Sequence, residues 1–384
     1  MKKIVFFLND WDPLLGYQDN ILIKQLLEQN NEVYLIVGKG RVKSQKLSRQ
    51  SYGDKFFINE LSYFFQINDG FYSLKGVSRN LNNIKPDIII ALDGQFDHIQ
   101  IIKYLKNNSG CRFFLKCHCD DSNSNLRIIS KYLIYPFIRR PIFFLLSRYI
   151  HRILVVTPKT GIFMEKVYKA KRIKMQLFPM LPKFRFNKDS EIKYKKQIRK
   201  ELNIEDDAFV IFTGGRLTHL KKTDILLQAV SLITKENIHV IICGKYSDEN
   251  MEYTSNLRNL VNTVKNVHYL SWIQHSEISN YLYASDISIF CAGQSSLWQD
   301  SISLGLPLIV GSGTEISEQD PSYLNEYNSV KIIPRNHVNP DVIKKCILNY
   351  YYDEDIMNRM REGSLKYYEK HLDPQKLTRI ITDD

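Results

Sequence analysis

Short apolar runs rich in β-branched and aromatic residues alternate with amphipathic helical stretches along almost the whole chain. This alternation predicts repeated βα units, in which parallel strands form a sheet and the connecting helices cover its faces. The strands expected in the first half are Ile4–Leu8, Val33–Val37, Asp87–Ala91, Arg112–Lys116 and Ile153–Val156. Those expected in the second half are Phe209–Thr213, Ile238–Cys243, Val267–Leu270, Ile287–Phe290, Leu308–Val310 and Val330–Ile333. Among the helices expected in the first half are Asp19–Gln29, Asp97–Asn107 and Leu126–Arg148.

A chain of 384 residues is long for one core and comfortable for two domains. The rhythm breaks between Gln176 and Lys200, where two prolines and a dense run of lysines predict an interdomain linker. We expect a first domain over 1–180 and a second over 181–371. Two doubly wound domains in tandem would place the carboxyl ends of both sheets around a shared, ligand-binding cleft. Pro374 would break the last long helix and let residues 372–384 cross back onto the first domain.

The composition places the chain among cytoplasmic globular proteins. An apolar content of 44% makes disorder unlikely on physical grounds, and the apolar run after Met1 ends at Asn9, too short for a secretory signal. No apolar segment approaches the ~18 residues that a membrane-spanning helix needs. Irregularly spaced cysteines, several of them inside apolar runs, agree with a reducing compartment. They are Cys111, Cys117, Cys119, Cys243, Cys291 and Cys346.

The net charge of +12 is concentrated in one stretch, because residues 126–200 carry 20 Lys plus Arg against three acids. A basic surface of this kind attracts phosphate in nucleic acid, anionic lipid or a phosphorylated substrate. Within this stretch, Leu126–Arg152 mixes six cations with aromatic residues and has no acid. That mixture favours docking on an anionic membrane surface, although a helix packed on the sheet with its basic edge in water fits equally. No recognised nucleic-acid-binding module accompanies it.

The expected strand Phe209–Thr213 runs into Gly214-Gly215-Arg216, and Lys221-Lys222 follow at the head of a helix. Glycines let backbone N–H groups come close to a ligand, a helix N-terminus adds a partial positive charge, and the arginine and lysine add two full charges. This pattern predicts an anion site that suits a diphosphate. The alternative is an ordinary strand-to-helix turn with two solvated cations.

A second small-residue loop follows the expected strand Ile287–Phe290. Gly293, Gln294, Ser295 and Ser296 could offer backbone N–H and hydroxyl donors to another face of the phosphate. Asp300 lies one helical turn beyond Ser296, where it could accept hydrogen bonds from sugar hydroxyls. The serines could equally be helix caps and the aspartate a solvated helix residue.

Together these motifs resemble the carboxy-terminal domain of the GT-B glycosyltransferases, in the large retaining family of capsule, lipopolysaccharide and phosphatidylinositol sugar transferases (glycosyl transferases group 1). The motifs that match are Gly214-Gly215-Arg216-Leu217 with Lys221, Cys243-Gly244-Lys245, Val267-His268-Tyr269-Leu270-Ser271-Trp272, Tyr281 with Ala284-Ser285-Asp286, and Asp300 with Gly305-Leu306-Pro307. They follow the family's order and approximate spacing. The resemblance is weaker over the first domain, where Gly16, the Pro86-Asp87-Ile88-Ile89 strand and His118 match.

The resemblance implies two Rossmann-like domains facing a central cleft and a role for each matching residue. Arg216 and Lys221 would hold the donor diphosphate, and Lys222 stands where the family usually has glycine. Gly244, Trp272 and Ile273 would border the nucleotide base, and Asp300 would bind the ribose in place of the family's second glutamate. Gly16 would let a first-domain loop approach the transferring sugar. The family's first glutamate corresponds to Ala292, which leaves the donor sugar and the catalytic details open.

In the first domain, His118 and the carboxylates Asp120 and Asp121 follow the end of the expected strand Arg112–Lys116. The resemblance implies that His118 contacts the donor sugar and supports the charge that develops in the transition state; a purely structural histidine fits the sequence equally. Cys117-His118-Cys119 lacks a second ligand pair at zinc-site spacing, so we expect no metal.

Three aspartates are candidate acceptor-binding residues. Asp93 and Asp97 flank Gly94 after the strand Asp87–Ala91, and Asp120 follows His118. Asp93 and Asp97 could equally be turn and cap residues. The Gly38-Lys39-Gly40 sequence follows the second strand and lacks a third glycine, so it disfavours a nicotinamide enzyme.

We therefore expect a hexosyltransferase-type glycosyltransferase that needs no metal or other cofactor. It would move a sugar from a nucleotide diphosphate donor, UDP-linked by expectation, to a lipid-linked or surface-polysaccharide acceptor with retention. We expect it in the cytoplasm, peripheral on the inner face of the plasma membrane. The alternatives are a nucleotide-sugar epimerase or hydrolase of the same fold, or a noncatalytic nucleotide-sugar-binding subunit. An RNA-binding role would instead show strongly salt-dependent affinity.

Overall fold

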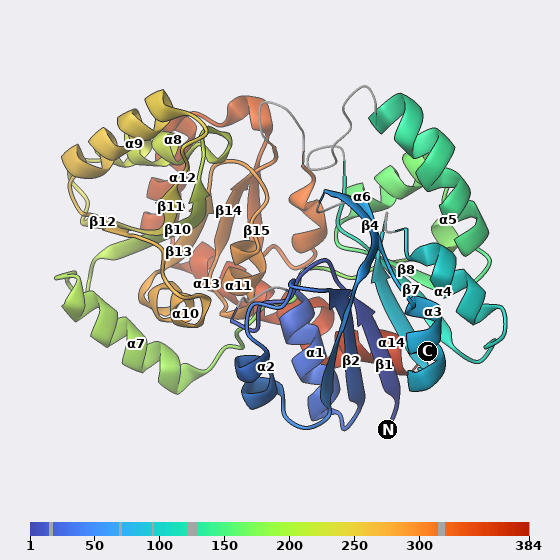
Figure 1. Ribbon diagram of the computed structural model, residues 1–384. Helices are drawn as coiled ribbons and strands as arrows, with labels where there is room; N and C mark the ends of the chain where they lie inside the picture. Colours follow the sequence, from blue (N-terminus) through green and yellow to red (C-terminus); the bar gives the residue numbers. More distant parts are fainter. Residues whose placement is uncertain (15–17, 69–70, 94–95, 121–129, 314–318, 384) are drawn as a thin grey trace. The chain divides into compact units, whose positions relative to one another are not determined.

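The computed structural model describes residues 1–14, 18–68, 71–93, 96–120, 130–313 and 319–383. The chain divides into two compact units, which are coloured by sequence in Figure 1. Unit 1 comprises Met1–Pro179 and Pro374–Asp384, and unit 2 comprises Met180–Asp373. Each unit is an α/β structure built on its own parallel sheet, as the alternation of strand-like and helical segments predicts.

Unit 1 contains a seven-stranded sheet with the order β3-β2-β1-β6-β7-β8-β9, and every described pairing in it is parallel. The strands are β1 (Lys3–Phe7), β2 (Glu32–Gly38), β3 (Phe56–Leu61), β6 (Ile88–Leu92), β7 (Arg112–Cys117), β8 (Ile150–Val155) and β9 (Met175–Leu177). The five strands expected in this half are confirmed, and β3 and β9 extend the sheet at its edges. Because helices cover both faces, the central strands are apolar almost throughout.

The helices of unit 1 include two π-helical segments. The α-helices are α1 (Gln18–Glu28), α2 (Gln45–Tyr52), α3 (Val77–Ile84), α4 (His98–Leu105), α5 (Arg140–Leu146), α6 (Pro158–Phe163) and α14 (Pro374–Thr382). The others are the π-helices η1 (Ser130–Arg139) and η2 (Met164–Tyr168) and the short 3₁₀ segment η3 (Arg172–Lys174). The helix expected over Leu126–Arg148 is thus η1 followed by α5, with Pro136 inside η1. Residues 126–129 lie outside the described residues.

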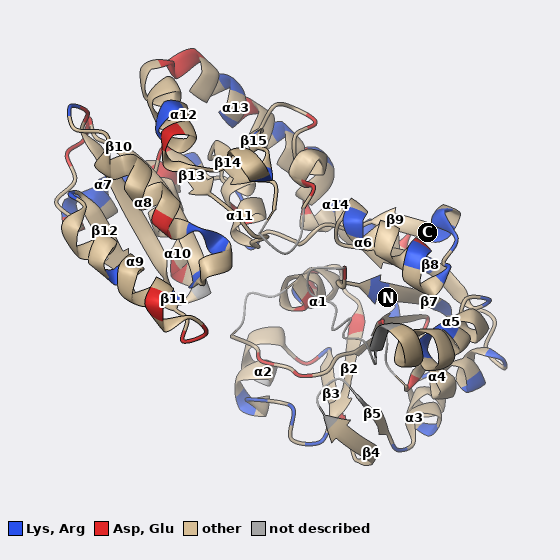
Figure 2. Cartoon of the chain, turned by 90° about the horizontal axis from the view of Figure 1, so that it is seen from above, with Lys and Arg blue, Asp and Glu red and all other residues tan. Residues whose placement is uncertain are grey.

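A two-stranded antiparallel hairpin that the sequence did not suggest lies between β3 and α3. It consists of β4 (Tyr63–Asn68) and β5 (Phe71–Leu74). In Figure 2 it lies beside β3 and α3 at the edge of unit 1. The hairpin forms a separate sheet because its strands pair only with each other among the described residues.

The last helix, α14, packs against α1 of unit 1, as the expected crossing back requires. Leu377 and Ile381 are buried on one side of α14. Its carboxyl end is held by the Lys2 ammonium and by Arg112 Nη2, which both donate to the Thr382 carbonyl, the latter at 3.0 Å. Such cations are favourable at the negative end of a helix dipole.

Unit 2 contains a six-stranded sheet with the order β12-β11-β10-β13-β14-β15. The strands are β10 (Phe209–Leu217), β11 (Ile238–Tyr246), β12 (Val267–Leu270), β13 (Ile287–Phe290), β14 (Leu308–Gly311) and β15 (Val330–Ile333). All six coincide with expected strands, although β10 and β11 continue several residues further. This is a doubly wound order: β11 and β12 are added on one side of β10, and β13, β14 and β15 are added on its other side. The switch point of unit 2 therefore lies between β10 and β13.

Helices lie on both faces of this sheet. They are α7 (Lys188–Glu201), α8 (Thr223–Ser231), α9 (Met251–Thr263), α10 (His275–Ala284), α11 (Leu297–Ser303), α12 (Pro340–Tyr352) and α13 (Glu354–Tyr367). The short helical segments are η4 (His219–Lys221), η5 (Pro321–Leu324), η6 (Arg335–His337) and the π-helical η7 (Tyr368–Leu372). Two hydrophobic clusters form the core of the unit, with Phe212 and Trp298 in one and Ile211 and Ile343 in the other.

The expected linker over Gln176–Lys200 is wrong for most of its length. Residues Met175–Leu177 form β9 of unit 1, and the lysine run forms α7 of unit 2, which packs against α10. Only the intervening stretch, about Phe178 to Asn187, connects the units without a regular element. The lysine-rich composition marks a helix with a solvated face, which the prolines before it obscured.

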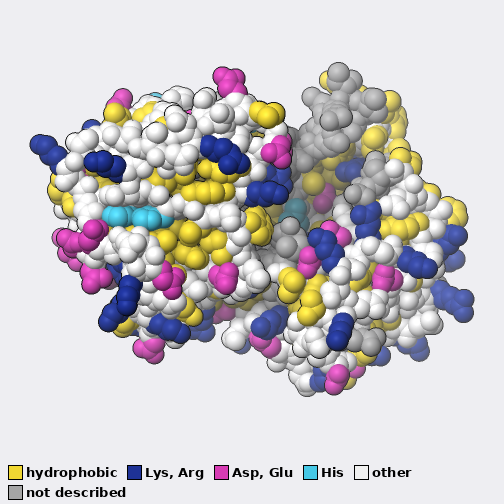
Figure 3. Space-filling model, turned by 60° about the vertical axis from the view of Figure 1, so that its left-hand side comes forward, with side chains coloured by type: hydrophobic (Ala, Val, Ile, Leu, Met, Phe, Trp, Pro, Cys, Tyr) yellow, Lys and Arg dark blue, Asp and Glu magenta, His cyan; other side chains and the backbone are white. Residues whose placement is uncertain are grey.

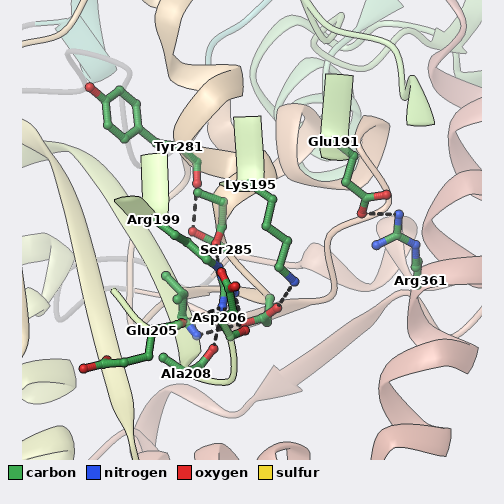
Figure 4. Close-up of polar contacts among 12 residues, drawn as sticks. Glu191, Lys195, Arg199, Glu205, Asp206, Ala208, Tyr281, Ser285 and Arg361 are labelled. Atoms are coloured by element: carbon green, nitrogen blue, oxygen red, sulfur yellow. Dashed lines mark hydrogen bonds and ion pairs between the residues drawn. The ribbon is translucent and has the colours of Figure 1, made fainter. Parts of the chain in front are cut away.

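Arg199 fixes α7 to the sheet (Figure 4). Its guanidinium is buried and donates to the carbonyls of Ala208 at 2.8 Å and Ala284 at 3.1 Å. It also pairs with the Asp286 carboxylate at 2.7 Å, to which Lys195 donates at 2.8 Å. Because a buried guanidinium without partners would be costly, this network is a strong reason for α7 to belong to unit 2.

The cations of residues 126–200 do not belong to one surface element. Figure 2 shows Lys and Arg on α5 of unit 1 and on α7 of unit 2. Several are held inside their own unit: Lys174 donates to the carbonyls of Ser147 and Ile150, and Arg140 donates to Val167. The cations of this stretch are therefore divided between the two units, and the expectation of a single basic surface stays a prediction. In the described part of the chain, no helix has the length and apolar character needed to cross a bilayer.

Candidate functional site

The Gly214-Gly215-Arg216 sequence lies within β10, rather than in a loop after it. Gly215 pairs in register with Gly244 of β11. A Cβ on Gly244 would lie 2.1 Å from the Gly215 carbonyl oxygen, and one on Gly214 would lie 2.5 Å from the Cys243 carbonyl oxygen. Both glycines are therefore required by the close approach of two backbones, and Gly215 has a φ of 107° that favours glycine.

Lys221 brings a partly buried cation to the switch point of unit 2. It ends the 3₁₀ turn η4, and its ammonium donates to the Gln294 carbonyl in the loop after β13. A Cβ on Gly293 would lie 3.0 Å from Lys221 Cδ and 3.3 Å from Nζ, so the side chain lies directly against this loop. Burial, and secondarily the charge of Arg216, lowers the pKa of Lys221 to about 8. With a pKa of about 8, the ammonium still carries its positive charge at neutral pH.

Arg216 supplies the second charge from a more exposed position. Its side chain is 71% exposed and lies 3.5 Å from a Glu249 carboxylate oxygen. An exposed ion pair of this kind contributes little stability, so the guanidinium can exchange Glu249 for a ligand at small cost. Arg216 and Lys221 together place positive charge at the carboxyl ends of β10 and β13, where ligands of doubly wound sheets bind.

Lys222 adopts the left-handed conformation with φ 52° and ψ 39°, directly before α8. This conformation strains residues with a Cβ and is the natural place for glycine. It gives a physical reason for the glycine that the resemblance places here. In this chain a lysine adopts the conformation.

The loop after β13 faces the glycines of β10. Ser295 Oγ would lie 3.9 Å from a Cβ on Gly215, and it accepts a hydrogen bond from the Leu297 N–H at 3.3 Å. Ser295 therefore has the capping type of contact that the sequence left open, whereas Ser296 makes no side-chain cap bond. Ala292, in the position of the family's first glutamate, is buried.

Asp300 is buried in α11, and its Oδ1 accepts a hydrogen bond from the Lys183 N–H at 2.9 Å. The carboxylate is therefore not the solvated helix residue that was one of the two expectations. It binds the segment that enters unit 2, a structural contact that the sequence did not indicate. A further role toward a ribose stays a prediction.

Of the three residues expected to border a nucleotide base, Gly244 lies within β11, and Trp272 and Ile273 follow the end of β12. Gly244 is in the strand pairing described above, and its carbonyl accepts a hydrogen bond from the Tyr269 hydroxyl at 3.0 Å. Trp272 is 67% exposed, and Ile273 is partly buried against the core of unit 2. A tryptophan left in solvent at a strand end offers a ring face to a planar ligand.

In unit 1, His118 follows the carboxyl end of β7 and is half-buried. Burial first, and then the charge of Lys116, lowers the pKa of His118 to about 3, while Asp19 opposes the shift. The imidazole is therefore neutral at physiological pH. Lys116 is buried and forms an ion pair with Asp19 in the first turn of α1. The sequence did not single out this pair, and Gly16, expected nearby, lies outside the described residues.

The three candidate acceptor aspartates have different surroundings. Burial raises the pKa of Asp93 to about 6 against the opposing effect of Arg139, with which it lines a small cavity near Tyr168. Asp97 is buried, and its Oδ1 accepts hydrogen bonds from Ser73 Oγ at 2.9 Å and the Leu74 N–H at 2.8 Å. Asp120 is also buried.

Asp97 therefore holds the β4–β5 hairpin and makes no side-chain cap bond to α4. This contact joins residues more than twenty positions apart, so no local pattern could have indicated it. Within the described ranges, no group of three or more His, Cys, Asp or Glu side chains is placed to hold a metal ion. All six cysteines are unpaired.

Comparisons with known proteins agree with this arrangement. Residues 194–362 match the family model described as Glycosyl transferases group 1. No curated protein matches the sequence. The glycosyltransferase from Rickettsia africae ESF-5 superposes with a TM-score of 0.71 at 12% identity, covering 100% of this chain and 97% of that one.

HepE from Anabaena in complex with UDP and glucose gives a TM-score of 0.70 at 11% identity, with 100% of this chain and 99% of that chain covered. WaaG, a glycosyltransferase involved in lipopolysaccharide biosynthesis, gives 0.64 at 13% identity, with 99% and 100% covered. At these identities the structures show the fold. The chain therefore has the GT-B fold, and its residues 194–362 match the model of the glycosyl transferases group 1 family.

Proposed function

We propose that the protein transfers a hexose from a UDP-linked donor to a lipid-linked or surface-polysaccharide acceptor, with retention at the anomeric carbon. The observation that carries this proposal is the partly buried Lys221 ammonium, which donates to the Gln294 carbonyl at the switch point of a domain that matches the glycosyl transferases group 1 family model. UDP is the nucleotide in the HepE complexes, which share the fold. WaaG, with its role in lipopolysaccharide biosynthesis, supports a surface glycan as acceptor.

In this proposal Arg216 and Lys221 bind the diphosphate and stabilise the negative charge that accumulates on it as the glycosidic bond breaks. Two fixed cations do the work for which other transferases use a divalent ion, so no metal is required. The partial burial of Lys221 strengthens its attraction for an anion, because less water competes for the charge. Asp300 would bind the ribose, and Trp272 with Ile273 and Gly244 would border the base.

His118 would contact the transferring sugar as a neutral imidazole, able to donate one hydrogen bond and accept another. A neutral group of this kind stabilises a developing oxocarbenium ion without repelling it. Lys116 lies two residues before His118 and its positive charge favours the neutral form of the imidazole, while its ion-pair partner Asp19 opposes that effect.

The test is turnover of a nucleotide sugar by Arg216→Ala and Lys221→Ala. Each should lower kcat by about 10²-fold or more with the fold intact, because each removes a charge that acts in the transition state. Lys265→Ala is the matched control, since Lys265 is an exposed lysine at the amino end of β12, the opposite edge of the same sheet. Unchanged turnover in both site variants would remove the diphosphate assignment.

Two alternatives are separated by the same assay. Release of free sugar without an acceptor would favour a hydrolase or epimerase of this fold. Binding of UDP without turnover against any acceptor would favour a noncatalytic subunit, an alternative that the buried Ala292 in place of a glutamate keeps open. Transfer to an acceptor excludes both.

We also propose that the protein works in the cytoplasm, peripherally at the inner face of the plasma membrane, and docks there through η1 and α5. Their exposed apolar side chains include Phe137 at 73% and Phe144 at 64% exposure, and the Arg148 guanidinium lies 5.9 Å from the Phe144 ring centre. Hydrophobic side chains reach the surface among charged ones, as Figure 3 shows for one face. Aromatic residues beside cations suit the interface of an anionic bilayer.

Sedimentation with vesicles tests the docking proposal. Phe137→Ser with Phe144→Ser should weaken binding to vesicles that contain phosphatidylglycerol, and salt should weaken the binding of the wild type. Met251→Ser, at an exposed position of unit 2, is the control. Equal sedimentation of the double variant and the wild type would contradict the proposal.

A further inference from the structure

The β4–β5 hairpin lies across the switch point of unit 1. In the sheet order β3-β2-β1-β6-β7-β8-β9, strands β2 and β3 are added on one side of β1 and the strands from β6 onward on its other side, so the switch point lies between β1 and β6. Doubly wound sheets bind ligands in the crevice at the carboxyl ends of such a strand pair. Tyr72 in β5 donates from its hydroxyl to Asn9 Oδ1 at 2.8 Å, just beyond β1. Ser73 and Leu74 donate to Asp97, just beyond β6. The hairpin thus ties together the loops that follow the two strands of the switch point.

A third attachment joins the hairpin to the end of β2. The Tyr63 hydroxyl lies so close to Gly38 that a Cβ there would be 2.0 Å from it, and Arg41 Nε donates to the same hydroxyl at 3.2 Å. Gln100 Nε2 adds a bond to the Leu74 carbonyl at 2.6 Å. An isolated two-stranded hairpin is at best marginally stable in water, so these contacts are what hold it in place.

Two β-bulges on β4 determine which side chains the hairpin presents. Tyr63 pairs with Leu74 and Phe65 with Ser73, so Phe64 is an extra residue in β4. Gln66 pairs with Tyr72 and Asn68 with Phe71, so Ile67 is a second extra residue. A bulge redirects a side chain and is enriched beside binding sites.

Both bulged residues are exposed apolar residues, the most exposed among the apolar side chains of the hairpin that the structure describes. Phe64 is 73% exposed and Ile67 is 72% exposed, whereas Phe65 packs against Phe96 with ring centres 5.6 Å apart. Exposing two large apolar side chains to water costs free energy. They belong to a hairpin that is held on the loops bordering the switch point of unit 1, and a ligand bound at that switch point would supply a reason for the cost.

We propose that Phe64 and Ile67 contact the hydrocarbon chain of a lipid-linked acceptor, so that the hairpin selects acceptors that carry such a chain. The proposal rests on the proposed transferase function and names the acceptor class for it. Arg41 donates to the hydroxyl of Tyr63, the residue before Phe64, and so adds a cation at the base of the hairpin that suits the phosphate joining a lipid chain to a glycan. The occupant is a single lipid chain at the switch point and not the surface of a bilayer.

Binding of alkyl phosphates to the full chain tests this assignment without any need for turnover. Octyl phosphate and dodecyl phosphate are titrated as monomers, and inorganic phosphate serves as the chain-free ligand. In the wild type, affinity should rise with chain length, by up to about fourfold for each methylene that is buried. In the variant Phe64→Ser with Ile67→Ser, dodecyl phosphate should bind at least about tenfold more weakly and inorganic phosphate should bind unchanged.

Ile173→Ser is the matched control, because Ile173 is 88% exposed in η3, before the amino end of β9 and thus at the opposite edge of the sheet. It should bind all three ligands as the wild type does, and thermal unfolding should show that both variants are folded. Equal affinity of wild type and double variant for dodecyl phosphate would overturn the proposal. Loss of binding to phosphatidylcholine vesicles with unchanged monomer binding would overturn it too, in favour of a membrane contact.

These results are independent of the transferase assay. If the wild type shows chain-length dependence but no sugar transfer, the proposed function fails and the lipid-chain site stands. If transfer occurs and the double variant binds dodecyl phosphate normally, only the role of the hairpin fails.

Discussion

The switch points of the two units have the same topology and very different construction. In unit 2 the switch point consists of two short stretches, residues 214–222 and 293–296, and the partly buried Lys221 of the first donates to a carbonyl of the second. In unit 1 a hairpin from elsewhere in the chain crosses the switch point and is held by contacts to loops after three strands. A phosphate can be bound by backbone and a few charges, whereas recognition of a variable partner needs an added element.

The largest effect in this comparison of the two units should come from His118, the candidate catalytic group of unit 1. His118→Ala should lower kcat by about 10²-fold, since it removes the hydrogen-bonding group that we propose contacts the transition state. KM for the donor should change little, because the residues proposed to bind the diphosphate, Arg216 and Lys221, belong to unit 2. His151→Ala, an exposed histidine near the amino end of β8, is the control. Full activity of the His118 variant would leave unit 1 without a catalytic role at this residue.

Gly244→Ala tests whether the switch point of unit 2 depends on backbone packing. The added Cβ would lie 2.1 Å from the Gly215 carbonyl oxygen, so β10 and β11 must separate. We expect a loss of about 1–3 kcal/mol in the free energy of unfolding and weaker donor binding, because Gly215 and Arg216 shift with the strand. Gly110→Ala, with no atom within 4 Å of its Cβ, should be nearly neutral. Denaturant unfolding and donor titration measure both effects.

The same contrast separates the features that could be predicted from the sequence from those that could not. Gly214, Gly215 and Lys221 are close in the chain, and glycines that allow close approach next to cations form a local pattern with a physical meaning. The hairpin is different: Asp97 contacts Ser73 and Leu74, and Asn9 contacts Tyr72, pairs that no spacing rule connects. The sheets followed from βα alternation, but β3 and β9 at the edges did not, because edge strands are short and less apolar.

The misplaced linker has a similar cause. Prolines and lysines around Gln176–Lys200 suggested irregular chain, whereas the lysines form the solvated face of α7 and Arg199 forms its buried anchor. Composition alone does not distinguish a solvated helix face from a linker here, because Arg199, the residue that anchors the helix, is itself a cation. The buried contacts of Arg199 with the Ala284 carbonyl and the Asp286 carboxylate, both more than eighty positions away, were beyond local reasoning.

The pH dependence of the reaction should separate the two regions. The pKa of Lys221 is lowered to about 8 by burial and by Arg216, so this residue loses its charge as the pH rises through that value. KM for the donor should therefore rise above about pH 8, by up to tenfold per unit, as the fraction of protonated Lys221 falls. A bound diphosphate raises the pKa of the lysine, so kcat should decline only at higher pH.

His118 should contribute no break to the same profile near pH 6.5, the usual value for histidine. Its pKa is lowered to about 3, chiefly by burial, so it stays neutral over the working range. Lys221→Arg should move the alkaline rise in KM to higher pH, because a guanidinium stays protonated. A break near pH 6.5 that disappears in His118→Asn would contradict the description of His118 as neutral.

The smallest effect concerns the backbone of unit 2. Lys222 has a φ of 52° and a ψ of 39°, a left-handed conformation that costs a residue with a Cβ about 1 kcal/mol relative to glycine. Lys222→Gly should therefore raise the free energy of unfolding by up to that amount, less the extra entropy of glycine in the unfolded chain. Lys222→Ala, which removes the charge and keeps the Cβ, separates the two contributions. If the glycine and alanine variants change the free energy of unfolding equally, backbone strain at position 222 does not explain the family's glycine. The change in stability from the wild type must then come from loss of the lysine side chain.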